Sequence, residues 1–231
     1  MEDLNARHRP LVVHARTGPD AMEALERAAQ VMARGGVVAY PTESFYGLGA
    51  DPESQGALER LMRAKGRPEG RPILLLIPRT EAMEALAARV PLLAYELAER
   101  FWPGGLTLVL EAAEGISPLL TAGSGKIGVR VSSHTLARGL CTAFGGAVTG
   151  TSANISGMPP CRSARGVLSA LGARLDLVLD GGETPGRSPS TVLDVSVSPP
   201  RILREGMITA EALQPYLRKA GAAGDPVEKI R

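Results

Sequence analysis

Short apolar runs separated by amphipathic stretches are the feature that most limits what this chain can fold into. Runs at residues 37–40, 73–77 and 106–110 have the length and composition of buried strands. Between the strands, a helix can start at Asp20 and end at the glycine pair 35–36. Because strands and helices mix without a strict β–α–β alternation, we predict an α/β (α+β) domain with a twisted, mostly mixed β-sheet flanked by helices.

The same patterns predict the remaining elements and the extent of the domain. We expect a glycine-bearing loop at 41–51, strands at 127–131, 147–149, 177–179, 191–195 and 202–203, and helices around 58–62 and at 81–88, 92–101, 134–144, 164–171 and 210–217. A length of 231 residues with 44% apolar content suits one domain. We therefore predict a flexible tail at 1–10, a single domain at 11–217 and a second flexible tail at 218–231.

Composition argues against a secreted or membrane protein. Residues 1–10 are charged and lack an apolar signal core, and no stretch approaches the roughly 20 apolar residues of a membrane span. We therefore expect a cytoplasmic protein without membrane contact. The formal net charge of +2 is too small to indicate nucleic-acid binding by itself.

Neither the cysteines nor the histidines form a metal-ligand pattern. Cys141 and Cys161 have no such spacing and are predicted to be reduced thiols, and the histidines at positions 8, 14 and 134 are equally scattered. We therefore predict no metal site. The Gly-Ser-Gly-Lys segment at 123–126 precedes a strand instead of a helix and lacks the first P-loop glycine, so it is not a Walker A loop.

Five stretches rich in glycine, hydroxyl or basic residues lie at the ends of predicted strands and helices. They are residues 41–47, 65–72, 102–107, 151–157 and 188–191. Loops at strand ends are where α/β folds place ligands. These stretches are therefore the candidates for a binding site.

Taken singly, each stretch supports two interpretations. Lys65, Arg67 and Arg71 suit a polyanion such as a triphosphate, or they are solvated loop charges. Residues 149–157 offer donors for phosphate oxygens or a carboxylate, or they form a turn that satisfies its own backbone. Arg130, at the end of a strand, suits bidentate binding of a carboxylate or a surface salt bridge.

Seven motifs occur in a fixed order along most of the chain. They read Tyr-Pro-Thr-Glu-Ser-Phe-Tyr-Gly-Leu-Gly at 40–49, Lys-Gly-Arg-Pro at 65–68, Trp-Pro-Gly-Gly-Leu-Thr at 102–107, Ile-Gly-Val-Arg at 127–130, Thr-Ser-Ala-Asn-Ile-Ser-Gly at 151–157, Ser-Thr-Val-Leu-Asp at 190–194 and Arg-Glu-Gly at 204–206. Together they resemble the YrdC-like threonylcarbamoyl-AMP synthase family, in its short, single-domain form.

The resemblance implies a concave basic cleft and a nucleotidyltransferase activity. Such an enzyme converts ATP, L-threonine and bicarbonate to threonylcarbamoyl-AMP and pyrophosphate, for the threonylcarbamoyladenosine modification of tRNA. It implies Mg²⁺ bound with the ATP. It also implies hand-over of the product to a tRNA threonylcarbamoyltransferase complex, with possible direct contact to tRNA or double-stranded RNA.

The resemblance also assigns roles to residues within the matching motifs. It implies Thr42, Arg130, Gly150 and Ser190 for threonine, and Lys65, Arg67, Ser152, Asn154 and Arg204 for ATP, with Lys65 and Arg67 as the catalytic pair. No protein ligand for the metal is implied. Glu43 is the only carboxylate in the first motif, and it either faces the substrate or forms a structural pair, so no general base is assigned.

Three positions depart from the family pattern, and they bear on threonine affinity and pocket shape. They are Phe45, at a position that is often small or β-branched, Leu76, where many members have histidine, and Ser132, where proline is frequent. Other functions stay open: a double-stranded RNA or tRNA-binding module, a paralogue with altered catalysis, and, ranked lowest, a scaffold. The intact Ser-Ala-Asn sequence at 152–154 argues against a degenerate site.

Overall fold

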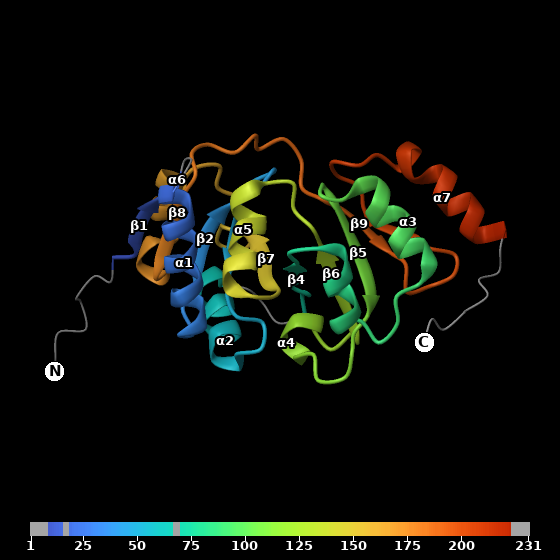
Figure 1. Cartoon of the computed structure of the whole chain (residues 1–231), viewed down its shortest axis with the longest axis horizontal. Helices are drawn as coiled ribbons and strands as arrows, with labels where there is room; N and C mark the ends of the chain where they lie inside the picture. The colour runs from blue at the N-terminus through green and yellow to red at the C-terminus, as the bar shows by residue number, and fades with distance from the viewer. Residues whose placement is uncertain (1–8, 16–18, 67–69, 223–231) are drawn as a thin grey trace.

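The computed structural model of the protein describes residues 9–15, 19–66 and 70–222, which form one twisted sheet with helices on both faces (Figure 1). Across the ten-stranded sheet, the strands lie in the order β1 (Leu11–His14), β8 (Leu177–Asp180), β2 (Val38–Pro41), β3 (Tyr46–Gly49), β7 (Val148–Ser152), β4 (Leu74–Leu76), β6 (Lys126–Arg130), β5 (Leu106–Glu111), β9 (Thr191–Asp194) and β10 (Arg201–Arg204). Parallel and antiparallel pairs both occur, as at β4 with β6 and β4 with β7. The predicted fold class, a mixed sheet flanked by helices, is confirmed.

The helices begin and end at residues that suit those positions. They are α1 (Pro19–Ala33), α2 (Gln55–Lys65), α3 (Leu92–Phe101), α4 (Pro118–Thr121), α5 (Thr135–Phe144), α6 (Ala164–Leu171) and α7 (Ala210–Ala222), with 3₁₀ helices η1 (Thr80–Ala85) and η2 (Gly172–Arg174). The Ser54 hydroxyl caps α2 by accepting from the Ala57 N–H, and Gly66 ends that helix in the left-handed conformation.

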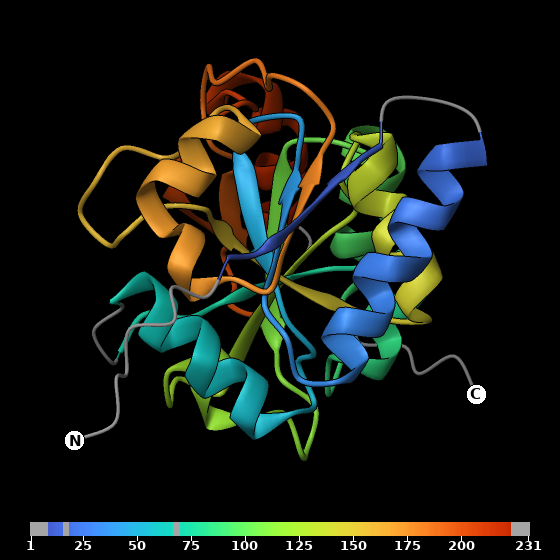
Figure 2. The same ribbon diagram turned by 90° about the vertical axis from the view of Figure 1, so that its left-hand side faces the viewer.

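Two apolar layers enclose the sheet. One face packs against α2, α3, α6 and α7 through residues such as Leu58, Leu97 and Val167. The opposite face packs against α1 and α5 through residues such as Met32 and Leu140. Figure 2 shows α1 and α5 on one side of the sheet and α2 and α6 on the other. The molecule is therefore a three-layer α/β/α domain.

The structure corrects several predicted boundaries. Part of the loop expected at 41–51 is the strand β3, because Tyr46 and Leu48 reach the core while the segment pairs antiparallel with β2. The helix expected at 81–88 is the short η1, and β7 extends to Ser152. The strand β1 and the helix α4 were not predicted by periodicity, and each has four residues.

The C-terminal boundary of the folded region also differs from the expectation. The helix α7 continues to Ala222, past the predicted end of the domain at residue 217. Within the part of the chain that the structure describes, no helix is long and apolar enough to cross a membrane.

Candidate functional site

A cavity of about 900 Å³ opens on the face of the sheet that α1 and α5 share. Its floor belongs to that face because Gly128 and Arg130 alternate along β6 with Ile127 and Val129, which point into the opposite core. The floor combines glycine and small apolar side chains from several strands: Gly47, Leu74, Val109, Gly128, Gly150 and Val192. These strands therefore leave space above the sheet for a ligand.

Gly150 keeps this floor open where β7 passes β4. A Cβ atom at this position would lie 2.7 Å from Leu74 Cδ1 and 3.1 Å from Leu76 Cγ. Both distances are shorter than an ordinary van der Waals contact. A larger residue here would push Leu74 toward the cavity, so the glycine fixes the shape of the floor.

Buried hydroxyl groups form one wall of the cavity. Thr42 follows β2, and its Oγ1 donates to the backbone oxygen of Phe45 at 2.6 Å and lies 3.2 Å from Ser44 Oγ. Farther along the wall, Thr107 Oγ1 and Ser190 Oγ lie 2.9 Å apart. Because each of these hydroxyl groups can both donate and accept, the wall suits carboxylate or phosphate oxygens.

Arg130 lies at the end of β6 with its side chain only 6% exposed. Its Nη1 forms an ion pair with Glu43 Oε1, and the other Glu43 oxygen accepts a hydrogen bond from Ser132 Oγ. Burial lowers the pKa of the Arg130 guanidinium to about 10. This value is well above neutral pH, so the buried group keeps its positive charge.

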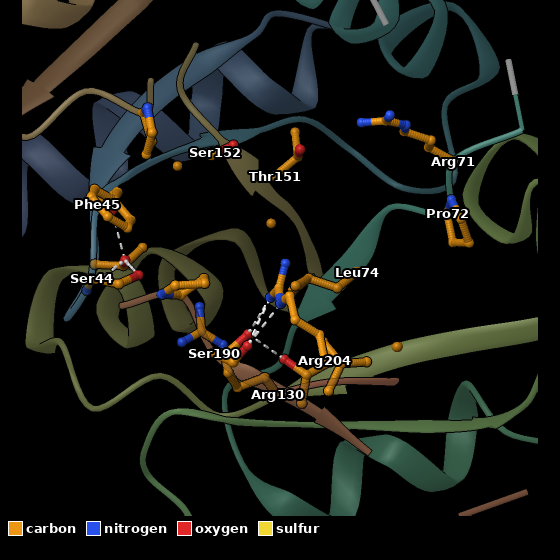
Figure 3. Close-up of a pocket in the computed structure, with 18 of the residues that line it drawn as sticks. Ser44, Phe45, Arg71, Pro72, Leu74, Arg130, Thr151, Ser152, Ser190 and Arg204 are labelled. Carbon is orange, nitrogen blue, oxygen red and sulfur yellow. Dashed lines mark hydrogen bonds between the residues drawn. The ribbon is translucent and has the colours of Figure 1, made fainter. Parts of the chain in front are cut away.

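Arg204, from β10, is the second guanidinium that lines the cavity. Its Nη2 donates to the backbone oxygen of Ser190 at 2.8 Å and to Ser190 Oγ at 3.3 Å, and its Nε donates to the same backbone oxygen at 3.2 Å. Figure 3 shows Arg130, Ser190 and Arg204 on one side of the cavity, with Thr151 and Ser152 across from them. Two strands that are distant in sequence thus bring two cations to one space.

Lys65 ends α2 and lies behind the cavity wall. Its side chain is almost fully buried, with 2% exposed. The ammonium group donates to the backbone oxygens of Ser152 and Asn154 and to Asn154 Oδ1. Asn154 Oδ1 also accepts from Ser152 Oγ at 2.6 Å. In this conformation Lys65 holds the loop after β7 instead of reaching into the cavity.

The structure brings together most of the residues predicted for the site. The residues that line the cavity are Thr42, Arg130, Gly150, Ser152, Ser190 and Arg204. Lys65 and Asn154 lie behind Ser152: Lys65 donates a hydrogen bond to Asn154, and Asn154 accepts one from Ser152. Arg67 lies outside the described residues.

Sequence reasoning missed several lining residues. Thr107 belongs to a quoted motif but received no role, although its hydroxyl group contacts Ser190. The segment 123–126 received no role after it was excluded as a P-loop, yet Ser124 and Lys126 line the cavity. Lys126 Nζ lies 2.8 Å from Asp194 Oδ2. The sequence held one signal for Lys126: it begins the strand that ends at Arg130, a residue already predicted for the site.

The three departures from the family pattern occupy different environments. Phe45 lines the cavity, so it does change the shape of the space. Leu76 is buried in the core beside α5 and does not line the cavity. Ser132 contacts Glu43, a contact that proline cannot make.

Carboxylates contribute little to the cavity surface. None of the described residues that line it is Asp or Glu. Within the described chain, no cluster of at least three His, Cys, Asp or Glu residues could hold a metal ion. A cation that entered with a polyphosphate would therefore depend on the phosphate oxygens and hydroxyl groups for its ligands.

The fold and the cavity define an α/β protein whose sheet carries a cleft suited to anionic ligands. The Sua5/YciO/YrdC family model, described as "Telomere recombination", matches residues 30–206. This segment covers most of the chain, and the chain belongs to that family.

Curated proteins of the same family are similar in sequence to this chain. The threonylcarbamoyl-AMP synthase of Pyrococcus abyssi is 39% identical over 187 residues, which are 81% of this chain and 55% of the relative. The enzyme of the same name from Thiobacillus denitrificans is 41% identical over 171 residues, which are 74% of this chain and 89% of the relative. The chain thus spans about half the length of some relatives and most of the length of others.

Solved structures share the fold over most of the chain. Sua5 of P. abyssi, complexed with L-threonine, is similar with a TM-score of 0.84 and 36% identity, over 90% of this chain and 61% of that one. E. coli YciO is similar with a TM-score of 0.78 and 27% identity, over 89% of this chain and 98% of that one.

Proposed function

We propose that the protein is an L-threonylcarbamoyladenylate synthase, a nucleotidyltransferase. In the proposed reaction, ATP, L-threonine and bicarbonate give threonylcarbamoyl-AMP, pyrophosphate and water. The observation that supports this proposal best is the convergence of two guanidinium groups and several hydroxyl groups in one cavity of about 900 Å³. That space is large enough for a nucleotide and an amino acid together.

The cavity offers suitable groups for each substrate. Arg130, with the hydroxyl groups of Thr42 and Ser190, would bind the threonine carboxylate, since a guanidinium binds a carboxylate through two parallel hydrogen bonds. Gly150 leaves room beside it. Arg204 and Ser152 would bind the nucleotide, and Lys65 and Asn154 would hold the loop that carries Ser152.

The chemistry needs positioning and charge stabilisation more than a covalent intermediate. The threonine amine captures carbon dioxide from bicarbonate as a carbamate, and water is released. A carbamate oxygen then attacks the α-phosphorus of ATP, and the bond to the β-phosphate oxygen breaks as pyrophosphate leaves. The cationic side chains oppose the negative charge that develops during this step.

Mg²⁺ is proposed as the companion of ATP. When bound, it would neutralise charge on the phosphates. The described lining residues fit a cation carried by its phosphate ligands, because among them are hydroxyl groups and no carboxylate.

Location and downstream partners follow from the same reaction. A tRNA-modifying role places the protein in the cytoplasm, where tRNA is available. Threonylcarbamoyl-AMP is a reactive mixed anhydride, so we propose its hand-over to a tRNA threonylcarbamoyltransferase complex.

Release of pyrophosphate tests the proposed function. Purified protein is incubated with ATP, Mg²⁺, bicarbonate and L-threonine, each substrate is omitted in turn, and L-serine replaces L-threonine in a parallel sample. The expected result is pyrophosphate release that requires both bicarbonate and threonine. Nucleotide binding without turnover would contradict the synthase activity and favour an RNA-binding module, whereas turnover with another amino acid would indicate an altered paralogue.

A further inference from the structure

Glu43 stands directly behind the cavity and has no role in the function proposed above. It follows Thr42 in the turn between β2 and β3, and its side chain is only 9% exposed. One carboxylate oxygen contacts Arg130 Nη1, and the other accepts from Ser132 Oγ. Arg130 lines the cavity, whereas Glu43 is shielded from it by these contacts.

The contact with Glu43 leaves another part of the guanidinium without a partner. Arg130 Nε is buried and has no hydrogen-bond partner among the described residues; Nη1 and Glu43 Oε1 likewise form no hydrogen bond there, but they face each other as an ion pair. A guanidinium is planar and has donors on more than one edge, so a carboxylate on Nη1 leaves the Nε donor available. A buried donor without a partner costs free energy, which a ligand oxygen would recover.

We propose that Glu43 is a positioning residue: it fixes the Arg130 guanidinium through Nη1, so that the Nε donor is presented to the carboxylate of the amino-acid substrate. This inference rests on the proposed function, because it takes threonine as the ligand. Of the two roles left open for Glu43, facing the substrate or forming a structural pair, it assigns the structural pair and gives that pair a consequence for substrate binding.

Charge balance favours this arrangement. A buried guanidinium without a counterion is strongly unfavourable, and Glu43 supplies that counterion. Arg204 then contributes the remaining positive charge, because its partners among the described residues are the neutral oxygens of Ser190. Arg130, Glu43 and Arg204 together carry one net positive charge, which matches the single negative charge of a substrate carboxylate.

Ser132 links the pair to the start of α5. Its Oγ donates to Glu43 and accepts from the backbone N–H of His134 at 3.2 Å. Its backbone oxygen accepts from Arg138 Nη1 at 2.7 Å. The carboxylate of Glu43 is therefore held from both sides, by β6 through Arg130 and by α5 through Ser132. This hydroxyl group is one of the departures from the family pattern, so the extra support is a property of this chain.

Binding of L-threonine and L-threoninamide tests the proposal, because the amide keeps the side chain and the amine but lacks the carboxylate. Both ligands are titrated calorimetrically into the unaltered protein, Glu43→Gln, Ser132→Ala and the exposed control Glu53→Gln. Glu43→Gln should weaken threonine binding roughly 30-fold, the range for a charged hydrogen bond, and Ser132→Ala by a smaller factor. Threoninamide binding should change little, and Glu53→Gln should match the unaltered protein.

A steady-state measurement separates positioning from proton transfer. Glu43→Gln should raise the KM for threonine while the KM for ATP and the pH profile of kcat stay unchanged. Loss of the acid limb of that profile would instead make Glu43 a general base. In the calorimetric titrations, equal weakening of threonine and threoninamide binding would make its role purely structural.

The outcomes also separate this inference from the function on which it rests. Unchanged threonine binding in Glu43→Gln would overturn the positioning role alone. Absence of threonine binding in the unaltered protein would overturn both. Ser132→Ala keeps the ion pair, so it reports on the arrangement even where Glu43→Gln fails to fold.

Discussion

The ammonium nitrogen of Lys65 lies 3.1 Å from both the backbone oxygen and the side-chain oxygen of Asn154. It also donates to the backbone oxygen of Ser152. One lysine at the end of α2 therefore organises the loop that follows β7, although this loop lies eighty-odd positions later in the chain. It does so by donating hydrogen bonds to several oxygens of that loop. Without Lys65 each of these oxygens would lose a charged donor, although the backbone oxygen of Ser152 keeps the N–H of Asn154 and Asn154 Oδ1 keeps Ser152 Oγ.

We expect Lys65→Met to lower the free energy of unfolding by about 3 kcal/mol, because the buried oxygens of Ser152 and Asn154 lose the charged donor that they share. Chemical denaturation measures this change. Arg63→Met, on an exposed position of the same helix, is the matched control and should have little effect. Equal stability of the two variants would contradict the role of Lys65 in holding the loop.

Gly150→Ala should destabilise the protein by about 2 kcal/mol, because the new Cβ would meet Leu74 Cδ1 at 2.7 Å. The measurement is thermal or urea unfolding, with threonine titration as a second readout of the altered floor. Combining the change with Leu74→Ala should recover part of the loss, since the smaller side chain relieves the contact.

Gly56→Ala is the control for the effect of an added methyl group. Nothing lies within 4 Å of a Cβ at this position in α2. We expect it to stabilise the protein by about 0.5 kcal/mol, because alanine loses less conformational entropy in a helix. Destabilisation by both glycine substitutions would argue against a specific clash at Gly150.

Asp194→Asn should reduce stability at neutral pH and have a smaller effect in acid. Burial acts to raise the pKa of Asp194, but hydrogen bonds from Lys126 and Ser196 outweigh it and hold that pKa below its ordinary value. A lowered pKa stabilises the folded state above the ordinary aspartate pKa of about 3.9, and this stabilisation is lost as the pH falls through the lower folded value.

Urea denaturation at pH 7 and below pH 4 measures this dependence. The difference in unfolding free energy between the unaltered protein and Asp194→Asn should shrink at the lower pH. The exposed substitution Glu114→Gln should show no comparable change. A difference that stays constant would mean that the charge of Asp194 does not contribute.

The two cysteines should differ in their reaction with a thiol reagent. Burial raises the pKa of Cys141 to about 12, and Cys141 is fully buried. Burial also raises the pKa of Cys161, although nearby Lys65 opposes the increase, and this side chain is only partly buried. At pH 7.5 we expect slow labelling of Cys161 and none of Cys141 until the protein unfolds. Cys161→Ser should remove the native-state reaction, and rapid labelling that persists in this variant would contradict the burial of Cys141.

Local patterns predicted most of the fold. The helix at 92–101 was predicted with the bounds that α3 has, because its apolar spacing and the following Trp-Pro-Gly-Gly sequence are local signals. The strand β3 was missed because its glycines favour a loop, and its pairing with β2 and β7 makes it a strand. The strand β1 was missed because it is short and lies at the sheet edge, where few core contacts constrain its sequence.

The residues that line the cavity were predicted more completely than their contacts. Motifs located Thr42, Arg130, Ser190 and Arg204, since glycine-rich and hydroxyl-rich loops at strand ends are visible in the sequence. Their partners are determined by which strands lie side by side. Glu43 meets Arg130, and Lys65 meets Asn154, through pairings in a sheet whose strand order does not follow the chain. The sequence by itself determined the chemical groups and the fold class. Only the tertiary structure decided which charged side chains are paired and which face the cavity, because those pairings depend on contacts between residues far apart in the chain.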